Sequence, residues 1–245
     1  MKIISELVRV AVLFVVVSYV TTNIQNFCSS VSRVQHVTFE TDLLFSPQTV
    51  EEILSYTHLL RFNSSYNPAA LVKHLPERFS CIKSIDIQPL PYNAAKLIIS
   101  AKEPLVAINN KHILTKSGTL LSCGNYDEKT RESLTSIAMA EAEMHNITPV
   151  MLQALSYCID SKLTKSYNIE WLHEHELRLY DKNNKYVAIV CDSASLPNEK
   201  QLSQCTELIK EKITQKPNAQ WKADVRFDDQ IIISMDKGGQ HGTFA

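Results

Sequence analysis

Alternating and amphipathic patterns predict the elements of the first half of the chain. Residues 34–39 (VQHVTF) alternate apolar and polar side chains, as a half-buried strand does. Ser46-Pro47 and Asn67-Pro68 each place a capping side chain before a proline, which predicts the start of two helices. Two further strand patterns follow at 81–87 and 95–101. The predicted order is strand, helix, helix, strand, strand.

Residues 97–121 join this first part to the rest of the chain. They contain three short strand patterns, and the last two cover 105–108 and 112–114. Pro104 lacks an N–H group and fits a strand start, while Gly118 marks the turn after the third run. Because no Gly/Ser-rich spacer separates these runs, a second domain is expected to begin directly at residue 104.

The second half repeats the mixture of strands and helices. Thr148-Pro149 predicts a helix start, and a second helix should cover 197–214 with Leu202, Cys205, Leu208, Ile209 and Ile213 on its inner face. The predicted strands are 169–172, 176–180, 186–190, 220–227 and 230–235. We therefore expect an α+β protein whose second domain is mixed α/β with a mainly antiparallel sheet.

The amino-terminal region is apolar enough to cross a membrane. Residues 10–32 carry no charge, and a spanning helix needs about 20 mostly apolar residues. Lys2 and Arg9 precede the run, which predicts a cytoplasmic amino terminus. We expect a cytoplasmic tail at 1–9, a transmembrane helix at 10–27 and an extracytoplasmic remainder. A cleaved signal peptide is the alternative, although no A-x-A-like cleavage site follows the apolar run.

Composition narrows the function classes. The formal net charge is −1, which offers no field that favours nucleic acid. Only five glycines occur, and the chain contains no GxGxxG, Walker or GxSxG motif. We therefore expect no cofactor, no small-molecule substrate and no enzymatic activity.

Taken together, the element order and a few short motifs suggest a family. The chain resembles the bacterial cell-division proteins FtsQ and DivIB, in which a single anchor precedes a POTRA domain and a β-domain. Glu103, Pro104 and Ala107 match the family's Glu-Pro-x-x-Ala motif, and Gly118 matches its turn. Asp224-Val225-Arg226-Phe227 matches a near-terminal Asp-x-Arg-aromatic run. The resemblance implies a POTRA-like βααββ domain at 34–103, a β-domain at 104–236 and a flexible tail at 237–245.

The same resemblance implies a role and a partner. Such a protein is a bitopic scaffold of the divisome, located in the inner membrane at the division septum, where it recruits other membrane proteins during septation. Its partners would look like the FtsB and FtsL coiled-coil pair. If the last strand is a sheet edge, it could pair with a partner strand. The residues expected at this contact are Asp224, Arg226, Phe227, Gln230, Ile231, Ile232 and Ile233.

Other readings of the sequence remain open. A POTRA-containing envelope transport or assembly factor is the main alternative, and a secreted cysteine or metal hydrolase is another. His173-Glu174-His175 could hold a metal or be a solvated turn. Asp224 and Arg226 could pair with each other instead of with a partner. Five cysteines would lie outside the cytoplasm, either in disulfides or as buried thiols: Cys81, Cys123, Cys158, Cys191 and Cys205.

Overall fold

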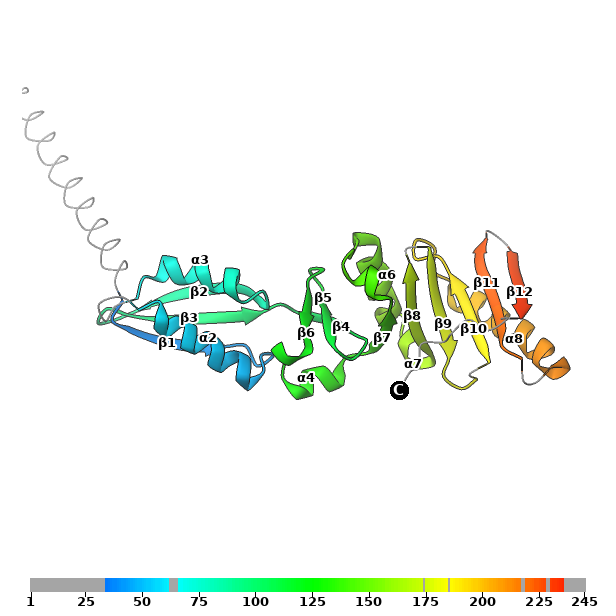
Figure 1. Cartoon of the computed structure of the whole chain (residues 1–245), viewed down its shortest axis with the longest axis horizontal. Coiled ribbons are helices and arrows are strands. Elements are labelled where there is room, and N and C mark those ends of the chain that lie inside the picture. Colours follow the sequence, from blue (N-terminus) through cyan, green and yellow to red (C-terminus); the bar gives the residue numbers. More distant parts are fainter. Residues whose placement is uncertain are drawn as a thin grey trace, which may run out of the picture. The chain divides into compact units, whose positions relative to one another are not determined.

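The computed structural model describes residues 34–61, 66–173, 175–184, 186–216, 219–227 and 230–235 (Figure 1). The chain divides into two compact units, with the boundary between Ala101 and Lys102. Both units combine helices with a sheet, so the expected α+β class is confirmed.

Unit 1 contains the predicted strand, helix, helix, strand, strand order. Its elements are β1 (His36–Thr41), α2 (Pro47–Leu59), α3 (Pro68–Arg78), β2 (Ile82–Leu90) and β3 (Ala94–Ala101). The sheet has the order β1-β3-β2, in which β1 runs parallel to β3 and β2 runs antiparallel to it. The small βααββ fold predicted from the sequence is therefore confirmed.

Local chemistry explains why the helices of unit 1 begin where they do. The Ser46 hydroxyl accepts a hydrogen bond from the Thr49 N–H at 3.1 Å, and the Asn67 side chain accepts from the Ala69 N–H at 3.1 Å. Each cap satisfies a backbone donor that has no partner within its helix. The helices pack on the sheet through a core that includes Ile53, Leu71, Leu75, Leu97 and Ile99.

Unit 2 is built on one large sheet. Its strands are β4 (Pro104–Ile108), β5 (His112–Thr115), β6 (Leu120–Ser122), β7 (Ser136–Met139), β8 (Tyr167–His173), β9 (Glu176–Asp181), β10 (Val187–Cys191), β11 (Trp221–Phe227) and β12 (Gln230–Met235). Its helices are the 3-10 turn η1 (Cys123–Asn125), α4 (Glu128–Ser133), α5 (Glu141–Met144), α6 (Pro149–Asp160), α7 (Leu163–Ser166) and α8 (Glu199–Gln215).

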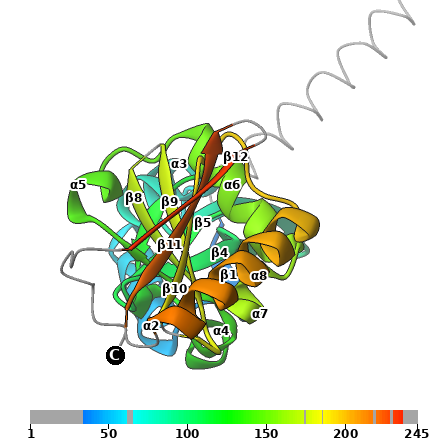
Figure 2. The same cartoon turned by 90° about the vertical axis from the view of Figure 1, so that its right-hand side faces the viewer.

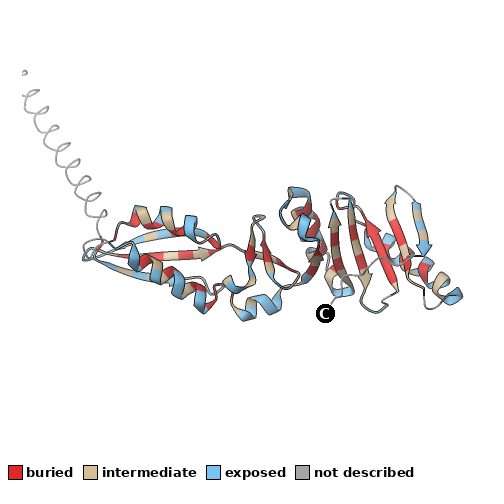
Figure 3. Ribbon diagram, viewed as in Figure 1, coloured by how far each residue is buried: buried red, intermediate tan, exposed pale blue. Residues whose placement is uncertain are grey.

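The nine strands have the order β12-β11-β10-β9-β8-β7-β4-β5-β6. Neighbouring strands are antiparallel except for the parallel pairs β4–β7, β7–β8 and β10–β11. The sheet is thus mixed and mainly antiparallel, as expected. Figure 2 views it from the β12 end, where α8 lies alongside β10 and β11. Buried residues are concentrated in the central strands, and all five residues of β10 are buried (Figure 3).

The sequence patterns missed two short strands, β6 and β7, and misplaced one side chain. β7 was not predicted, although it joins β4 to β8 and so makes one continuous sheet. Leu208 was expected on the inner face of its helix, but it is 40% exposed. Helical periodicity gives the direction of an apolar stripe, but the width of the stripe depends on what packs against it.

Among the described residues, no helix has the length and apolar character needed to span a bilayer. The predicted transmembrane helix at 10–27 and the predicted tail at 237–245 lie outside the described residues. The anchor therefore stays a prediction from the sequence.

Candidate partner-binding edge

β12 forms one edge of the nine-stranded sheet. Among the described residues it pairs with β11 alone, in an antiparallel register that matches Trp221 with Met235 and Asp224 with Ile232. The register shifts between Asp224 and Phe227, where β11 has one more residue than β12. Such a β-bulge locally increases the twist of an edge. The condition that the sequence left open, that residues 230–235 form an edge strand, is met.

The hydrogen bonds of β11 show which way its backbone groups point. The Trp221 N–H donates to the Tyr186 carbonyl at 2.7 Å, on the side of β10. Because the backbone groups of successive residues in a strand point to opposite sides, those of Lys222 and Asp224 point toward β12.

The register then divides β12 into two sets of residues. Asp224 lies opposite Ile232, so the backbone groups of Ile232 are directed toward β11. Those of Ile233, one position further, are directed away from the sheet. The residues whose N–H and C=O groups face the open edge are Ile231, Ile233 and Met235. This refines the sequence-based expectation, which listed residues 230–233 at the contact without distinguishing their backbone directions.

Side chains along β12 also alternate. Ile231 and Ile233 are partly buried and pack against the core of unit 2. On the other face, Ile232 is 45% exposed, and Phe227 at the end of β11 is 50% exposed. The edge therefore combines outward-facing backbone groups with exposed apolar side chains, which is the combination that strand addition uses.

Asp224 and Arg226 pair with each other. The Arg226 Nε and Nη2 atoms donate to the Asp224 carboxylate at 2.9 and 2.6 Å, and the Arg226 N–H donates to Asp224 Oδ1 at 3.2 Å. This last bond satisfies a backbone donor at the bulge. Since the carboxylate is 8% exposed and held by its neighbour, the alternative in which these two residues pair is confirmed.

Arg226 also reaches a second carboxylate, which the sequence analysis missed. Its Nη1 atom lies 3.6 Å from Glu176 Oε2, across β10. Arg178 binds the same Glu176 at 2.6 Å, and Tyr180 donates to Glu170 at 2.8 Å. Period-two alternation in β9 could have placed Glu176, Arg178 and Tyr180 on one face. The closeness of Glu176 to Arg226 depends on the registers of β9, β10 and β11, which no local pattern encodes.

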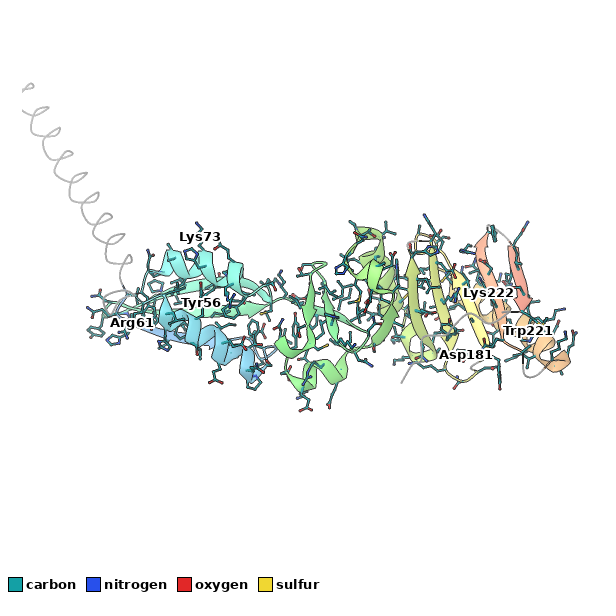
Figure 4. The ribbon with its side chains drawn as sticks, in the orientation of Figure 1. Tyr56, Arg61, Lys73, Asp181, Trp221 and Lys222 are labelled. Atoms are coloured by element: carbon teal, nitrogen blue, oxygen red, sulfur yellow. The ribbon has the colours of Figure 1, made fainter. Side chains whose placement is uncertain are left out.

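The charge pairs around Asp224 and Glu176 shift the pKa values of both carboxyl groups. Burial by itself raises the pKa of Asp224, but the hydrogen bonds from Arg226 and its charge outweigh this, and the net shift is downward. The pKa of Glu176 is also lowered, because the bonds and charges of Arg178 and the charges of Lys222 and Arg226 outweigh burial. Lys222 is labelled on β11 in Figure 4. Both carboxylates are therefore ionised at neutral pH.

The residues matched to the Glu-Pro-x-x-Ala motif lie near the other end of the sheet. Pro104 begins β4, and the Glu103 carbonyl accepts from the Lys116 N–H at 2.9 Å. Ala107 is buried between β5 and β7. Gly118 has a φ of +81° in the turn before β6, and a Cβ atom there would lie 3.0 Å from the Leu152 Cδ1 atom. Each of these residues therefore has a role in local backbone geometry or packing.

The histidines and cysteines do not form a metal site in the described part of the chain, where no suitable group of three ligands exists. His173 and His175 are exposed, and His175 lies 3.2 Å from Asp192. Of the two alternatives for the cysteines, the structure has free thiols at Cys81, Cys123, Cys158, Cys191 and Cys205, and Cys158 and Cys205 are buried. Burial raises the pKa of Cys158 to about 12 and that of Cys205 to about 11. These two thiols are therefore poor nucleophiles.

Comparison with known proteins gave no match, either to a model of a protein family or to a curated protein.

Proposed function

We propose that this chain is a bitopic, non-enzymatic scaffold that links cell-division membrane proteins during septum formation, as the FtsQ and DivIB proteins do. Three features support the proposal: the apolar run at 10–27, the βααββ unit after it, and the mixed sheet that ends in an open strand. The scaffold would sit in the inner membrane at the division septum, with its amino terminus in the cytoplasm and units 1 and 2 outside it.

The observation that carries the proposal is the form of β12. Ile231, Ile233 and Met235 direct their N–H and C=O groups to the open side of the strand, and a partner strand could pair with them. The resemblance to FtsQ and DivIB suggests that the partner strand comes from a protein pair similar to the coiled-coil proteins FtsB and FtsL. Backbone pairing supplies affinity in strand addition, and side-chain contacts supply specificity.

Specificity at this edge should depend more on apolar contacts than on ion pairs. Arg226 is already engaged by Asp224 at 2.6 Å and lies 3.6 Å from Glu176. A partner carboxylate would have to compete with both. Phe227 and Ile232 are half exposed, so they are the side chains that a partner strand would cover.

Two substitutions at one position test this mechanism. Ile233→Ala removes the side chain but keeps the outward N–H, whereas Ile233→Pro also removes that donor. Proline is tolerated in an edge strand where its N–H would face solvent. We expect the alanine variant to retain the FtsB- and FtsL-like partners in a pull-down from detergent-solubilised membranes, and the proline variant to lose them.

Both substitutions shorten a side chain that packs on the core of unit 2, so the pull-downs are compared at a temperature at which circular dichroism shows the parent and both variants to be folded. Equal recovery of the partners by a folded Ile233→Pro chain would rule out pairing at this edge. Localisation of a fluorescent fusion separates the broader alternatives. A midcell band agrees with division, whereas a uniform envelope signal favours a transport or assembly factor.

A further inference from the structure

The described chain enters unit 1 beside a hairpin. The Gln35 N–H donates to the Asn93 carbonyl at 2.9 Å, and Val34 and Tyr66 exchange backbone hydrogen bonds at 3.1 and 2.7 Å. Figure 1 shows β1 starting next to the turn between β2 and β3. Val34, Tyr66 and the hairpin turn therefore share one end of this unit.

Exposed apolar side chains gather at this end. Tyr92 in the hairpin turn is 94% exposed, Leu90 is 40% exposed, and Leu59 at the end of α2 is 80% exposed. Arg61, labelled in Figure 4, follows α2 and lies with its guanidinium carbon 5.4 Å from the centre of the Tyr66 ring. We call Leu59, Arg61, Leu90 and Tyr92 the hairpin surface.

Tyr92 has a backbone conformation that its side chain disfavours. Its φ is +61°, a region where bulky side chains are uncommon outside special turns. An asparagine or glycine would fit this position with less strain. The aromatic ring is almost fully exposed, so packing within unit 1 does not compensate for the strain. We therefore expect the Tyr92 ring to make a contact beyond the described residues.

This end of unit 1 carries an arginine but no acidic side chain. The described residues 34–37, 58–61, 66–70 and 87–95 contain no aspartate or glutamate, and Arg61 is their one arginine or lysine. Residues 62–65, whose sequence is FNSS, add no acid. A surface of leucine, tyrosine and arginine without acids matches the headgroup layer of a membrane that contains anionic lipid.

The length of the preceding chain limits how far this surface can be from a bilayer. If the anchor ends at residue 27, six residues separate it from Val34. Six extended residues reach about 20 Å at most. We propose that the hairpin surface lies in the lipid headgroup layer beside the anchor, with Tyr92 and Leu90 inserted and Arg61 near lipid phosphates. This inference rests on the membrane anchoring proposed above.

Tryptophan substitution at two matched positions tests the contact. Tyr92→Trp reports the hairpin surface, and Leu43→Trp reports the opposite end of unit 1, where Leu43 is 92% exposed. The full chain is placed in vesicles that contain lipid brominated high in the acyl chains and an anionic headgroup. After subtraction of the signal of the parent chain, which contains Trp171 and Trp221, we expect bromine to quench the tryptophan at 92 more strongly than that at 43.

The contribution of Arg61 is measured in the same vesicles. One basic side chain near an anionic surface corresponds to about a five-fold change in the docked population. Arg61→Gln should therefore weaken the quenching at residue 92, and vesicles made of zwitterionic lipid alone should remove the difference between Arg61→Gln and its parent.

Alkaline carbonate extraction of the same vesicles separates two kinds of failure. A chain that remains in the membrane but shows equal quenching at 43 and 92 would refute docking of the hairpin surface and leave the anchor intact. A chain that is extracted would overturn the anchor, and with it both proposals.

Discussion

The two edges of the nine-stranded sheet end in different ways. β6 has three residues, and the chain turns directly from it into η1, where the Cys123 N–H donates to the Lys111 carbonyl at 3.1 Å. The buried Tyr126 then ties this region to Lys102 through a 2.8 Å hydrogen bond. β12 has six residues and, among those described, pairs on one side only. The β6 edge is short and continues into a locally hydrogen-bonded turn. The β12 edge is longer, and its outward-facing N–H and C=O groups have no partner strand among the described residues.

Composition deepens the contrast. Natural edge strands commonly carry lysine, proline or an inward-pointing charge that blocks pairing with other chains. β12 reads QIIISM, with three consecutive isoleucines and no charge. A strand of this kind is an aggregation risk when it stays uncovered. The difference between the edges supports a partner for β12 and a structural role for the β4–β6 end.

The largest effect is expected when proline replaces Ile232. The backbone of Ile232 points toward β11, so Ile232→Pro removes a donor from the β11–β12 ladder, whereas Ile233→Pro removes one from the open edge. We expect Ile232→Pro to lower the free energy of unfolding by about 3 kcal/mol, the upper end of the cost of leaving a backbone group without its hydrogen-bond partner. Urea denaturation followed by circular dichroism measures the change.

Ile233→Pro is the matched control for this effect. It should be clearly more stable than Ile232→Pro while it loses the partner. Equal destabilisation by the two prolines would mean that the backbone directions assigned to β12 are incorrect.

A smaller effect is expected at the closed end of the sheet. Gly118 has a φ of +81°, and a Cβ atom would approach Leu152 Cδ1 to 3.0 Å. Gly118→Ala should therefore cost about 1 to 2 kcal/mol of unfolding free energy through backbone strain. Because this turn lies at the end of the sheet away from β12, partner recovery should equal that of the parent at temperatures where both are folded.

Lys116→Ala, two residues before this glycine, controls for substitution in the same turn. Its backbone does not have a positive φ, and its ion pair with Glu103 is exposed, so its stability should stay nearer to that of the parent. Loss of partner binding in a folded Gly118→Ala chain would contradict the assignment of this end to structure.

Local chemistry in the sequence predicted most elements but not how they join. The caps at Ser46, Asn67 and Thr148 placed helix starts correctly because a cap depends on neighbouring residues alone. β7 reads SIAM, with a single β-branched residue and therefore a weak strand pattern, yet it connects β4 to β8. The site shows the same limit. Arg226 and Asp224 are two residues apart and were paired from sequence, whereas Glu176 meets Arg226 through a non-local register.

The pair Asp224 and Arg226 gives the smallest effect. At neutral pH the Asp224 carboxylate is ionised and accepts bonds from Arg226 at 2.6 and 2.9 Å. Asp224→Asn keeps the shape of the side chain but removes its charge, so we expect a loss of about 1 kcal/mol in unfolding free energy. The loss should also depend on pH. Because the pKa of Asp224 is lower in the folded chain than its ordinary value of 3.8, its stabilisation is complete above that value.

The stability gap between the parent and Asp224→Asn should therefore be constant from pH 7 to 5 and shrink as the pH falls below 3.8, through the folded pKa. Denaturant titrations at each pH measure the gap. A gap that stays constant to acidic pH would show that the charge of Asp224 does not stabilise the bulge.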